Sequence, residues 1–353
     1  MKILITGCLG FAGKTLCESI IASTDTIEII GVDNFSRKGC ELNVEHLRNL
    51  GIGIIRGDIR NPSDLEALPE VDWVLDCAAN PSVLAGIGND TSSRQVMEHN
   101  LVGTINLLEY CKQKGSGIIL LSTSRVYSAK KLSNLTVIEK NLAFEPEDGL
   151  SSAGLSSLGI SEQFPTTSPI SLYGASKLAS ETLILEYGAC FDFPVWINRC
   201  GVLAGAGQFG KPDQGIFSYW VHSYREKKPL KYLGFNGSGF QVRDALHPQD
   251  LGALIVDQIH APDRPVPKII NLGGGHANSI SLRRLSDWCE KRFGRTDVDS
   301  SKEDRPLDAP WIVMDSTLAK QSWGWAPTTS LEEILDGIAI YAEEHPDWLD
   351  TTC

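Results

Sequence analysis

Short apolar runs alternate with longer amphipathic stretches through the first 200 residues of the chain. The apolar runs have the length of buried strands and cover Lys2–Thr6, Ile27–Val32, Gly53–Arg56, Trp73–Asp76, Ile118–Leu121 and Val195–Asn198. Helical periodicity is present over Gly13–Ala22, Leu42–Leu50, Gln95–Gln113 and Ala175–Gly188. This alternation predicts an α/β fold with a doubly wound parallel sheet of the Rossmann type.

The alternation fades after about Cys200, where mixed short runs and a late helix over Leu331–Ala342 indicate a smaller α/β C-terminal lobe. We expect a first domain over residues 1–198, to which about 242–272 returns, and a second lobe formed mainly by 199–353. One long segment, Ser128–Pro169, is rich in Ser, Gly and Pro and is expected to be irregular. Loops of that length in compact domains are usually functional.

Glycines cluster directly after the first apolar run, at Gly7, Gly10 and Gly13. A strand, a glycine turn and a helix N-terminus form an anion site, because free backbone N–H groups and the positive end of the helix dipole face the turn. A side chain there would keep a pyrophosphate away from the backbone. Close packing is the alternative reason for such glycines.

The second predicted strand strengthens the cofactor interpretation, because it ends in Asp33. This residue lies 33 − 13 = 20 positions after Gly13, the spacing at which a dinucleotide site places a carboxylate on the adenosine ribose. A carboxylate repels a 2′-phosphate, so the sequence predicts NAD rather than NADP. Arg37 and Lys38 nearby weaken that preference.

Composition and charge exclude several classes of protein. The chain has 353 residues, is 42% hydrophobic and carries a formal net charge of −12, which argues against nonspecific binding to nucleic acid or to an anionic membrane. Its nine cysteines form no C-x-x-C pair, so reduced thiols and no metal site are expected. No apolar run approaches membrane-spanning length, and Met1 adjoins the first strand, so a cytoplasmic location is expected.

A candidate acid/base pair follows at Tyr173 and Lys177, in the pattern Y-x-x-x-K. The spacing places phenol and ammonium on one helix face. A neighbouring cation should lower the pKa of the phenol, which makes it a general acid/base for an alcohol proton. The strand ending in Leu121–Tyr127 should bring the Thr123 hydroxyl into the same cleft, although Thr123 and Ser124 also suit turn or capping duty.

Together these motifs resemble the extended short-chain dehydrogenase/reductase family, whose members act on nucleotide sugars. The matching residues are Gly7-x-x-Gly10-x-x-Gly13, Asp33, Gly57-Asp58-Ile59, Asn100, Thr123, Tyr173-x-x-x-Lys177, Gln241-Val242-Arg243-Asp244, Asn271–Gly275 and Trp323-Gly324-Trp325. Within the family the likeness is greatest to members that invert C2 of a CDP-linked sugar. That likeness is carried by Asp33–Gly39, Gly57–Asn61, Gln208-Phe209 and Asp213-Gln214-Gly215.

The resemblance implies roles by position. Thr123, Tyr173 and Lys177 are expected to be catalytic. NAD is expected to contact Gly7, Gly10, Phe11, Ala12, Gly13, Asp33, Asn34, Ser36, Arg37, Asp58, Ile59, Ala78, Ala79, Asn100, Tyr173 and Lys177, with Asp58 near the adenine. The substrate is expected to contact Asn80, Ser124, Arg125, Gln208, Gln214, Arg243 and Arg305. Arg243 and Arg305 are candidates for its diphosphate, and a surface or structural ion pair is the alternative reading for each.

Departures from the family pattern lie in the substrate cleft. Ser124-Arg125 stands where the sugar 4,6-dehydratases of the family carry Asp-Glu, which argues against water elimination. Val202 and Ala204 also differ from residues that relatives use near the substrate phosphates. The sugar and the nucleotide base are therefore left open.

The resulting hypothesis is an NAD-dependent nucleotide-sugar epimerase, in which a sugar carbon, C2 by preference, is oxidised and then reduced on the opposite face. Inversion at C4, a net oxidoreductase or decarboxylase on the same substrates, and a cofactor-binding protein without turnover are the alternatives. The family commonly pairs through two helices, so a homodimer or higher homo-oligomer is expected, with Gln95–Gln113 and Ala175–Gly188 as candidate interface segments.

Overall fold

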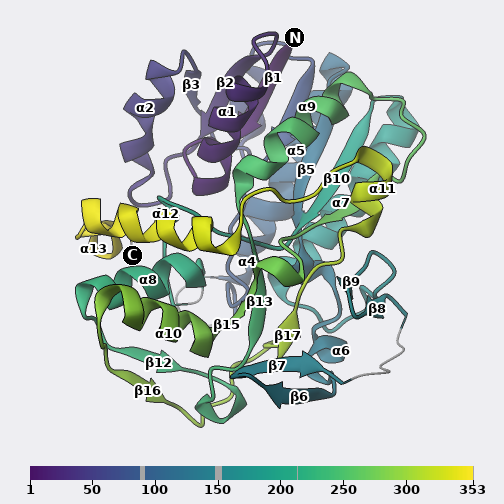
Figure 1. Cartoon of the computed structure of the whole chain (residues 1–353). Helices are drawn as coiled ribbons and strands as arrows, with labels where there is room; N and C mark the ends of the chain where they lie inside the picture. The colour runs from purple at the N-terminus through teal and green to yellow at the C-terminus, as the bar shows by residue number, and fades with distance from the viewer. Residues whose placement is uncertain (88–91, 148–152, 213, 353) are drawn as a thin grey trace.

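The computed structural model describes residues 1–87, 92–147, 153–212 and 214–352. Its centre is a parallel sheet of seven strands in the order β14-β10-β5-β4-β1-β2-β3 (Figure 1), which confirms the predicted α/β class. These strands are β1 (Lys2–Thr6), β2 (Glu28–Asp33), β3 (Gly53–Arg56), β4 (Trp73–Asp76), β5 (Gly117–Thr123), β10 (Val195–Cys200) and β14 (Ile269–Leu272). The last strand, β14, lies within residues 242–272, the stretch that was expected to return to the first domain.

Helices cover both faces of this sheet, because alternate residues of each buried strand point to opposite sides. Ile3 and Ile5 join one apolar cluster and Leu4 joins another. The first cluster includes side chains from α1 (Phe11–Ser23), α2 (Val44–Asn49), α9 (Gly252–His260) and α11 (Thr317–Trp323). The second includes side chains from α3 (Pro62–Glu66), α5 (Gly103–Lys114) and α7 (Leu172–Phe191).

The predicted helix over Gln95–Gln113 is divided in the structure. It begins with α4 (Ser93–Met97), passes through one π-helical turn at Glu98–Val102, and continues as α5. Such turns often occur at functional sites, and this one carries Asn100, which is 1% exposed.

After β10 the chain forms a second group of elements. A small sheet has the order β11-β13-β15, with β17 paired to β13. Its strands are β11 (Val202–Leu203), β13 (Val242–Leu246), β15 (Ser279–Ser281) and β17 (Trp311–Ile312). Beside it lie α8 (Ile216–Glu226), α10 (Leu282–Phe293), α12 (Leu331–Glu344), α13 (Trp348–Thr352), β12 (Leu230–Tyr232) and β16 (Val298–Ser300). Phe217, Leu285 and Ile338 of the three longer helices share one apolar cluster.

The segment Ser128–Pro169, expected to be irregular, instead contains regular structure in its described part. Its elements are α6 (Ala129–Ser133), β6 (Val137–Lys140), β7 (Ala143–Pro146), β8 (Leu155–Ser156) and β9 (Gly159–Ile160). Leu132, Leu155 and Ile160 are buried in a cluster with Trp311. Contacts between residues distant in sequence therefore stabilise these strands, which are too short to be recognised from the sequence pattern. The remaining short turns are 3₁₀ helices at Cys40–Asn43, Ser124–Val126, Phe235–Gly237, Pro248–Leu251 and His276–Asn278.

The strand register places the predicted site residues along one edge of the sheet. Thr6 pairs with Val32 and with Asp76, and Cys200 pairs with Thr123 and with Leu272. The glycine turn, Asp33 and Thr123 therefore lie at the carboxyl ends of parallel strands, where ligands of such folds bind. Across the described residues, no helix is both long enough and apolar enough to cross a lipid bilayer.

Candidate active site

A cavity of about 420 Å³ lies at the carboxyl edge of the main sheet and extends to the small sheet and α8. The predicted cofactor and catalytic residues in its lining are Gly7, Gly10, Phe11, Ala12, Gly13, Asp33, Asn34, Ser36, Arg37, Ile59, Ala78, Ala79, Thr123, Tyr173 and Lys177. The predicted substrate residues in its lining are Ser124, Arg125, Gln208, Gln214, Arg243 and Arg305. One cavity thus joins the glycine turn to the Tyr-Lys pair and to a group of arginines.

The glycine turn has a geometry that side chains would block. Gly7 has a φ of +63° and its N–H donates to the Val32 carbonyl at 2.8 Å. A Cβ on Gly13 would lie 2.2 Å from the Gly7 carbonyl oxygen, well inside van der Waals contact. Because α1 begins at Phe11 with Gly10 as its N-cap, the unpaired N–H groups of its first turn lie beside the cavity.

The Asp33 carboxylate ties the second strand to this turn. Its Oδ2 accepts from the Leu9 N–H at 3.0 Å and its Oδ1 accepts from the Phe35 N–H at 2.9 Å. Burial raises the pKa of Asp33, and the backbone hydrogen bonds oppose that rise. The carboxylate therefore shapes the turn, and its remaining lone pairs are available to ribose hydroxyls.

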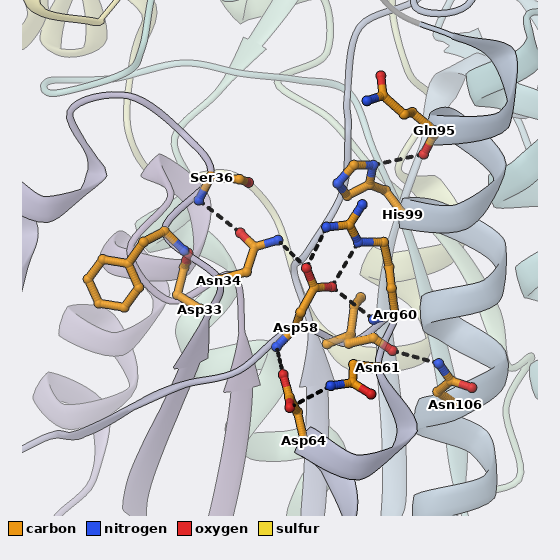
Figure 2. A network of polar contacts seen from close by, with 12 residues as sticks. Asp33, Asn34, Ser36, Asp58, Arg60, Asn61, Asp64, Gln95, His99 and Asn106 are labelled. Atoms are coloured by element: carbon orange, nitrogen blue, oxygen red, sulfur yellow. Dashed lines mark hydrogen bonds and ion pairs between the residues drawn. The ribbon is translucent and has the colours of Figure 1, made fainter.

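Asp58, expected near the adenine, belongs to a polar network beside the cavity (Figure 2). Arg60 donates to both carboxylate oxygens, from Nε at 2.9 Å and from a terminal nitrogen at 2.6 Å, and Asn34 donates to Oδ2 at 3.1 Å. The hydrogen bond with Arg60 holds the pKa of Asp58 well below its usual range. Asp58 is not itself among the described residues that line the cavity, although its neighbours Gly57 and Ile59 are.

Asn100 and Asn80 are joined by hydrogen bonds and lie outside the described cavity lining. Asn100 Oδ1 accepts from the Asn80 N–H at 2.7 Å, and its amide nitrogen donates to the Asn80 carbonyl and to Ser176 Oγ, both at 3.1 Å. Among the described lining residues neither asparagine is present. In this structure the Asn100 side chain therefore anchors the loop after β4 to α7.

Tyr173 enters the cavity from the first turn of α7. Ser171 caps this helix by accepting from the Gly174 N–H at 2.9 Å. A Cβ on Gly174 would lie 2.1 Å from the Arg125 carbonyl oxygen, so the absence of a side chain lets α7 approach the turn after β5. Tyr173 is 8% exposed and Lys177 is 2% exposed.

Burial controls the acidity of the Tyr173 phenol. It raises the pKa of Tyr173 to about 12, while a hydrogen bond with the Thr123 side chain and the charge of Arg125 act in the opposite direction. The sequence led us to expect a pKa lowered by Lys177. In the structure the pKa of Tyr173 is raised instead, because burial outweighs the opposing effects of Thr123 and Arg125.

The cavity lining also includes three guanidinium groups, those of Arg125, Arg243 and Arg305. Arg243 donates to Asp308 Oδ1 and to the Val242 carbonyl, each at 2.6 Å. Arg125 has its pKa lowered to about 10, first by burial and then by the charge of Arg243. Arg125, Arg243 and Arg305 therefore place three positive charges near the Asp308 carboxylate, an arrangement that favours an anionic ligand.

Further side chains line the cavity that the motifs did not identify, among them Cys200 and Asp308. Arg37 donates to Gln214 Oε1 at 3.2 Å and lies over the Phe209 ring at 5.2 Å. Gln208 donates to the Leu203 carbonyl at 2.6 Å. Asp213, one of the residues that resemble the C2-inverting members of the family, lies outside the residues that the structure describes.

The donor set at the glycine turn suits a dinucleotide. Helix N-terminal N–H groups, a cradle closed to any Cβ at Gly13, and a carboxylate at Asp33 suit pyrophosphate and ribose. Within 1–87, 92–147, 153–212 and 214–352, no three His, Cys, Asp or Glu side chains gather as metal ligands.

Comparison with a family model assigns residues 3–273 to the NAD dependent epimerase/dehydratase family. Among curated proteins, the chain is 29% identical over 346 residues to the CDP-paratose 2-epimerase of Salmonella typhi, covering 94% of this chain and 96% of that protein. It is 26% identical over 355 residues to the UDP-glucuronate 4-epimerase of Thermodesulfobacterium geofontis, covering 97% and 96%.

Solved structures show the same similarity. The UDP-glucuronic acid 4-epimerase of Bacillus cereus, in complex with UDP-glucuronic acid and NAD, superposes with a TM-score of 0.77. The identity is 26%, and the match covers 98% of this chain and 99% of that one.

Proposed function

The chain belongs to the NAD dependent epimerase/dehydratase family, and from this premise we propose that it is a nucleotide-sugar epimerase. The observation that carries the proposal is one cavity whose lining includes the glycine turn, Thr123, Tyr173 and Lys177 as well as the arginine group. A nucleoside diphosphate sugar has the matching parts, because its diphosphate is anionic and its sugar hydroxyls are neutral.

Each residue has a role in this proposal. Tyr173 removes the proton of a sugar hydroxyl and later returns it, and Thr123 donates a hydrogen bond to the reacting oxygen. Lys177 holds positive charge beside the reacting groups, and Arg125, Arg243 and Arg305 bind the diphosphate. NAD, when bound, supplies the acceptor and donor of the hydride. The ketone must turn within the cavity before reduction, so that hydride reaches its other face.

We favour C2 as the carbon that is inverted, with C4 as the second candidate. The 2-epimerase from Salmonella typhi and the two 4-epimerases named above support these positions in that order of sequence identity. Ser124 and Arg125 line the cavity in place of an acid/base pair, which disfavours water elimination at the neighbouring carbon.

A closed redox cycle is the first expected outcome. Incubation of the protein with CDP- and UDP-linked hexoses and a catalytic amount of NAD should interconvert epimers without net formation of NADH, because the same hydride leaves and returns. Nuclear magnetic resonance of the sugars and absorbance of NADH measure the two quantities. Release of NADH in proportion to substrate would identify a net oxidoreductase instead.

We expect NAD to bind at least about tenfold more tightly than NADP, a difference of about 1.4 kcal/mol. The reason is repulsion between the Asp33 carboxylate, which lines the cavity, and the 2′-phosphate of NADP. Calorimetric titration with both cofactors measures the difference. Asp33→Asn keeps an acceptor oxygen but loses the negative charge, so this variant should show a smaller difference between the two affinities. Equal affinities of the unmodified protein for NAD and NADP would contradict the assignment of NAD as the cofactor.

We also propose that the protein forms a homodimer or a higher homo-oligomer through α5 and α7. These helices pack against each other. Apolar side chains are exposed at the end of α7, where Phe191 is 46% exposed, and directly before α5, where Val102 is 38% exposed. Light scattering at increasing protein concentration should give a mass at least twice 38.5 kDa. A monomeric mass at all concentrations would exclude the proposal.

A further inference from the structure

A buried carboxylate, Glu181, connects the helix that carries Tyr173 to two strands of the main sheet, through an ion pair with Arg199 of β10 and a hydrogen bond from Ser122 of β5. Tyr173, Lys177 and Glu181 follow one another at four-residue spacing on α7, so their side chains share one face. Glu181 is 1% exposed, and Ser122, the residue before Thr123 on β5, donates to its Oε1. The reacting residues and Glu181 therefore belong to the same helix–strand contact.

Arg199 of β10 completes this contact. Its Nε donates to both Glu181 oxygens at 3.0 and 3.2 Å, and its terminal nitrogen donates to Oε2 at 2.7 Å. The side chains of Arg199 and Glu181 are 7% and 2% exposed. A bidentate pair of this kind fixes both distance and orientation.

The contact continues across the sheet at a single level. Arg199 is the register partner of Ser122 on β5 and of Asn271 on β14. Arg199 also donates to the Tyr127 hydroxyl at 3.3 Å, and that hydroxyl donates to Asn271 Oδ1 at 2.7 Å. Ser122 and Arg199 lie one residue before Thr123 and Cys200, and these two line the cavity.

We propose that Glu181, through its ion pair with Arg199 of β10 and the hydrogen bond that it accepts from Ser122 of β5, is a positioning residue that fixes Tyr173 and Lys177 of α7 against Thr123. This inference rests on the proposed function. It adds Glu181, a residue outside the Y-x-x-x-K pattern, as one that determines the geometry of the site. A buried pair contributes little net stability compared with apolar residues of the same size. Its geometric effect on the site can therefore be separated from its effect on folding.

Four variants in the NAD-loaded protein make that separation. Glu181→Gln and Arg199→Met each break the pair, and the double variant Glu181→Met/Arg199→Met removes both charges together. Gln258→Met is the matched control, because Gln258 makes two buried hydrogen bonds at 3.0 and 2.9 Å to Asn198, the neighbour of Arg199 on β10. Adjacent strand residues face opposite sides of the sheet, so this control weakens the sheet away from α7.

The expected result is a change in catalysis that does not follow stability. The single variants should lose about 10- to 100-fold in kcat, with a much smaller change in KM. The double variant should regain thermal stability and keep the loss in kcat. Gln258→Met should lose stability and keep the kcat of the unmodified protein.

The ionisation of Tyr173 gives a readout that needs no turnover. The groups facing its phenol are Thr123 on β5 and Arg125 after it, which lower the pKa of Tyr173, and Cys200 on β10, which raises it. A looser contact between α7 and β5 weakens the hydrogen bond with Thr123, so the phenol should titrate at higher pH in the double variant. Nuclear magnetic resonance of tyrosine labelled at Cζ, with Tyr173→Phe for assignment, measures this.

A double variant with the kcat, the pH profile and the Tyr173 titration of the unmodified protein would overturn the inference and leave the proposed function intact. Absence of epimer interconversion in the unmodified protein would overturn the proposed function, and the Tyr173 titration would still report on the positioning role.

Discussion

Tyr173→Phe is expected to lower kcat by about 100- to 10,000-fold, the usual contribution of a general acid/base, while NAD still saturates the protein. The variant removes only the hydroxyl, so the ring continues to fill a site that is 8% exposed. Tyr173 lines the cavity together with Thr123 and Lys177, so the variant loses the hydroxyl that exchanges a proton with the sugar in the proposed reaction. Steady-state kinetics with the preferred nucleotide sugar, together with calorimetry for NAD, measures both effects.

Tyr187→Phe is the matched control for this change. Tyr187 lies on the same helix, and its hydroxyl donates to Glu109 Oε1 at 2.8 Å, away from the described lining of the cavity. The same chemical change there should leave kcat unaltered. Equal kcat values for Tyr173→Phe and the unmodified protein would remove Tyr173 from the reaction.

Gly13→Ala is expected to weaken NAD binding by at least about tenfold, or about 1.4 kcal/mol. The added Cβ would lie 2.2 Å from the Gly7 carbonyl oxygen and 2.9 Å from Cys8 Cα. Both are backbone contacts, so the turn itself has to open. Such overpacking typically costs about 1–3 kcal/mol in the free energy of unfolding. Calorimetry with NAD and denaturant unfolding measure the two quantities.

Gly337→Ala controls for the loss of a glycine as such. Gly337 lies within α12, and a Cβ there would meet no atom within 4 Å. This variant should bind NAD normally and gain up to about 1 kcal/mol in stability, because alanine favours a helix interior. Normal NAD binding by Gly13→Ala would show that the turn tolerates a side chain and does not cradle the cofactor.

The features that the sequence predicted well are those carried by local patterns. Apolar runs identified six of the seven strands of the main sheet, and the spacing from Gly13 to Asp33 placed both at one edge of that sheet. The strand β14 had been expected only as a returning stretch within 242–272. Periodicity detects such elements because each buries its own continuous face.

Contacts between distant residues explain what the sequence did not reveal. Arg243 donates a hydrogen bond to Asp308, which lies 65 positions later, and Arg199 of β10 donates to Glu181 of α7. No local spacing in the sequence indicates either pair. The side chain of Asn100 contacts Asn80 and Ser176, which no local pattern indicated, and its expected contact with NAD stays a prediction. The pKa of Tyr173 depends on burial, which the spacing to Lys177 does not report.

The most direct test of the account follows a deuterium label on the sugar carbon that is inverted. Nucleotide sugars labelled at C2 or at C4 are incubated with the protein and unlabelled NAD in ordinary water, and the epimeric product is analysed by mass spectrometry and nuclear magnetic resonance. A hydride that leaves and returns within one cavity predicts full retention of the label at the inverted carbon. Exchange of that label with water would contradict the account.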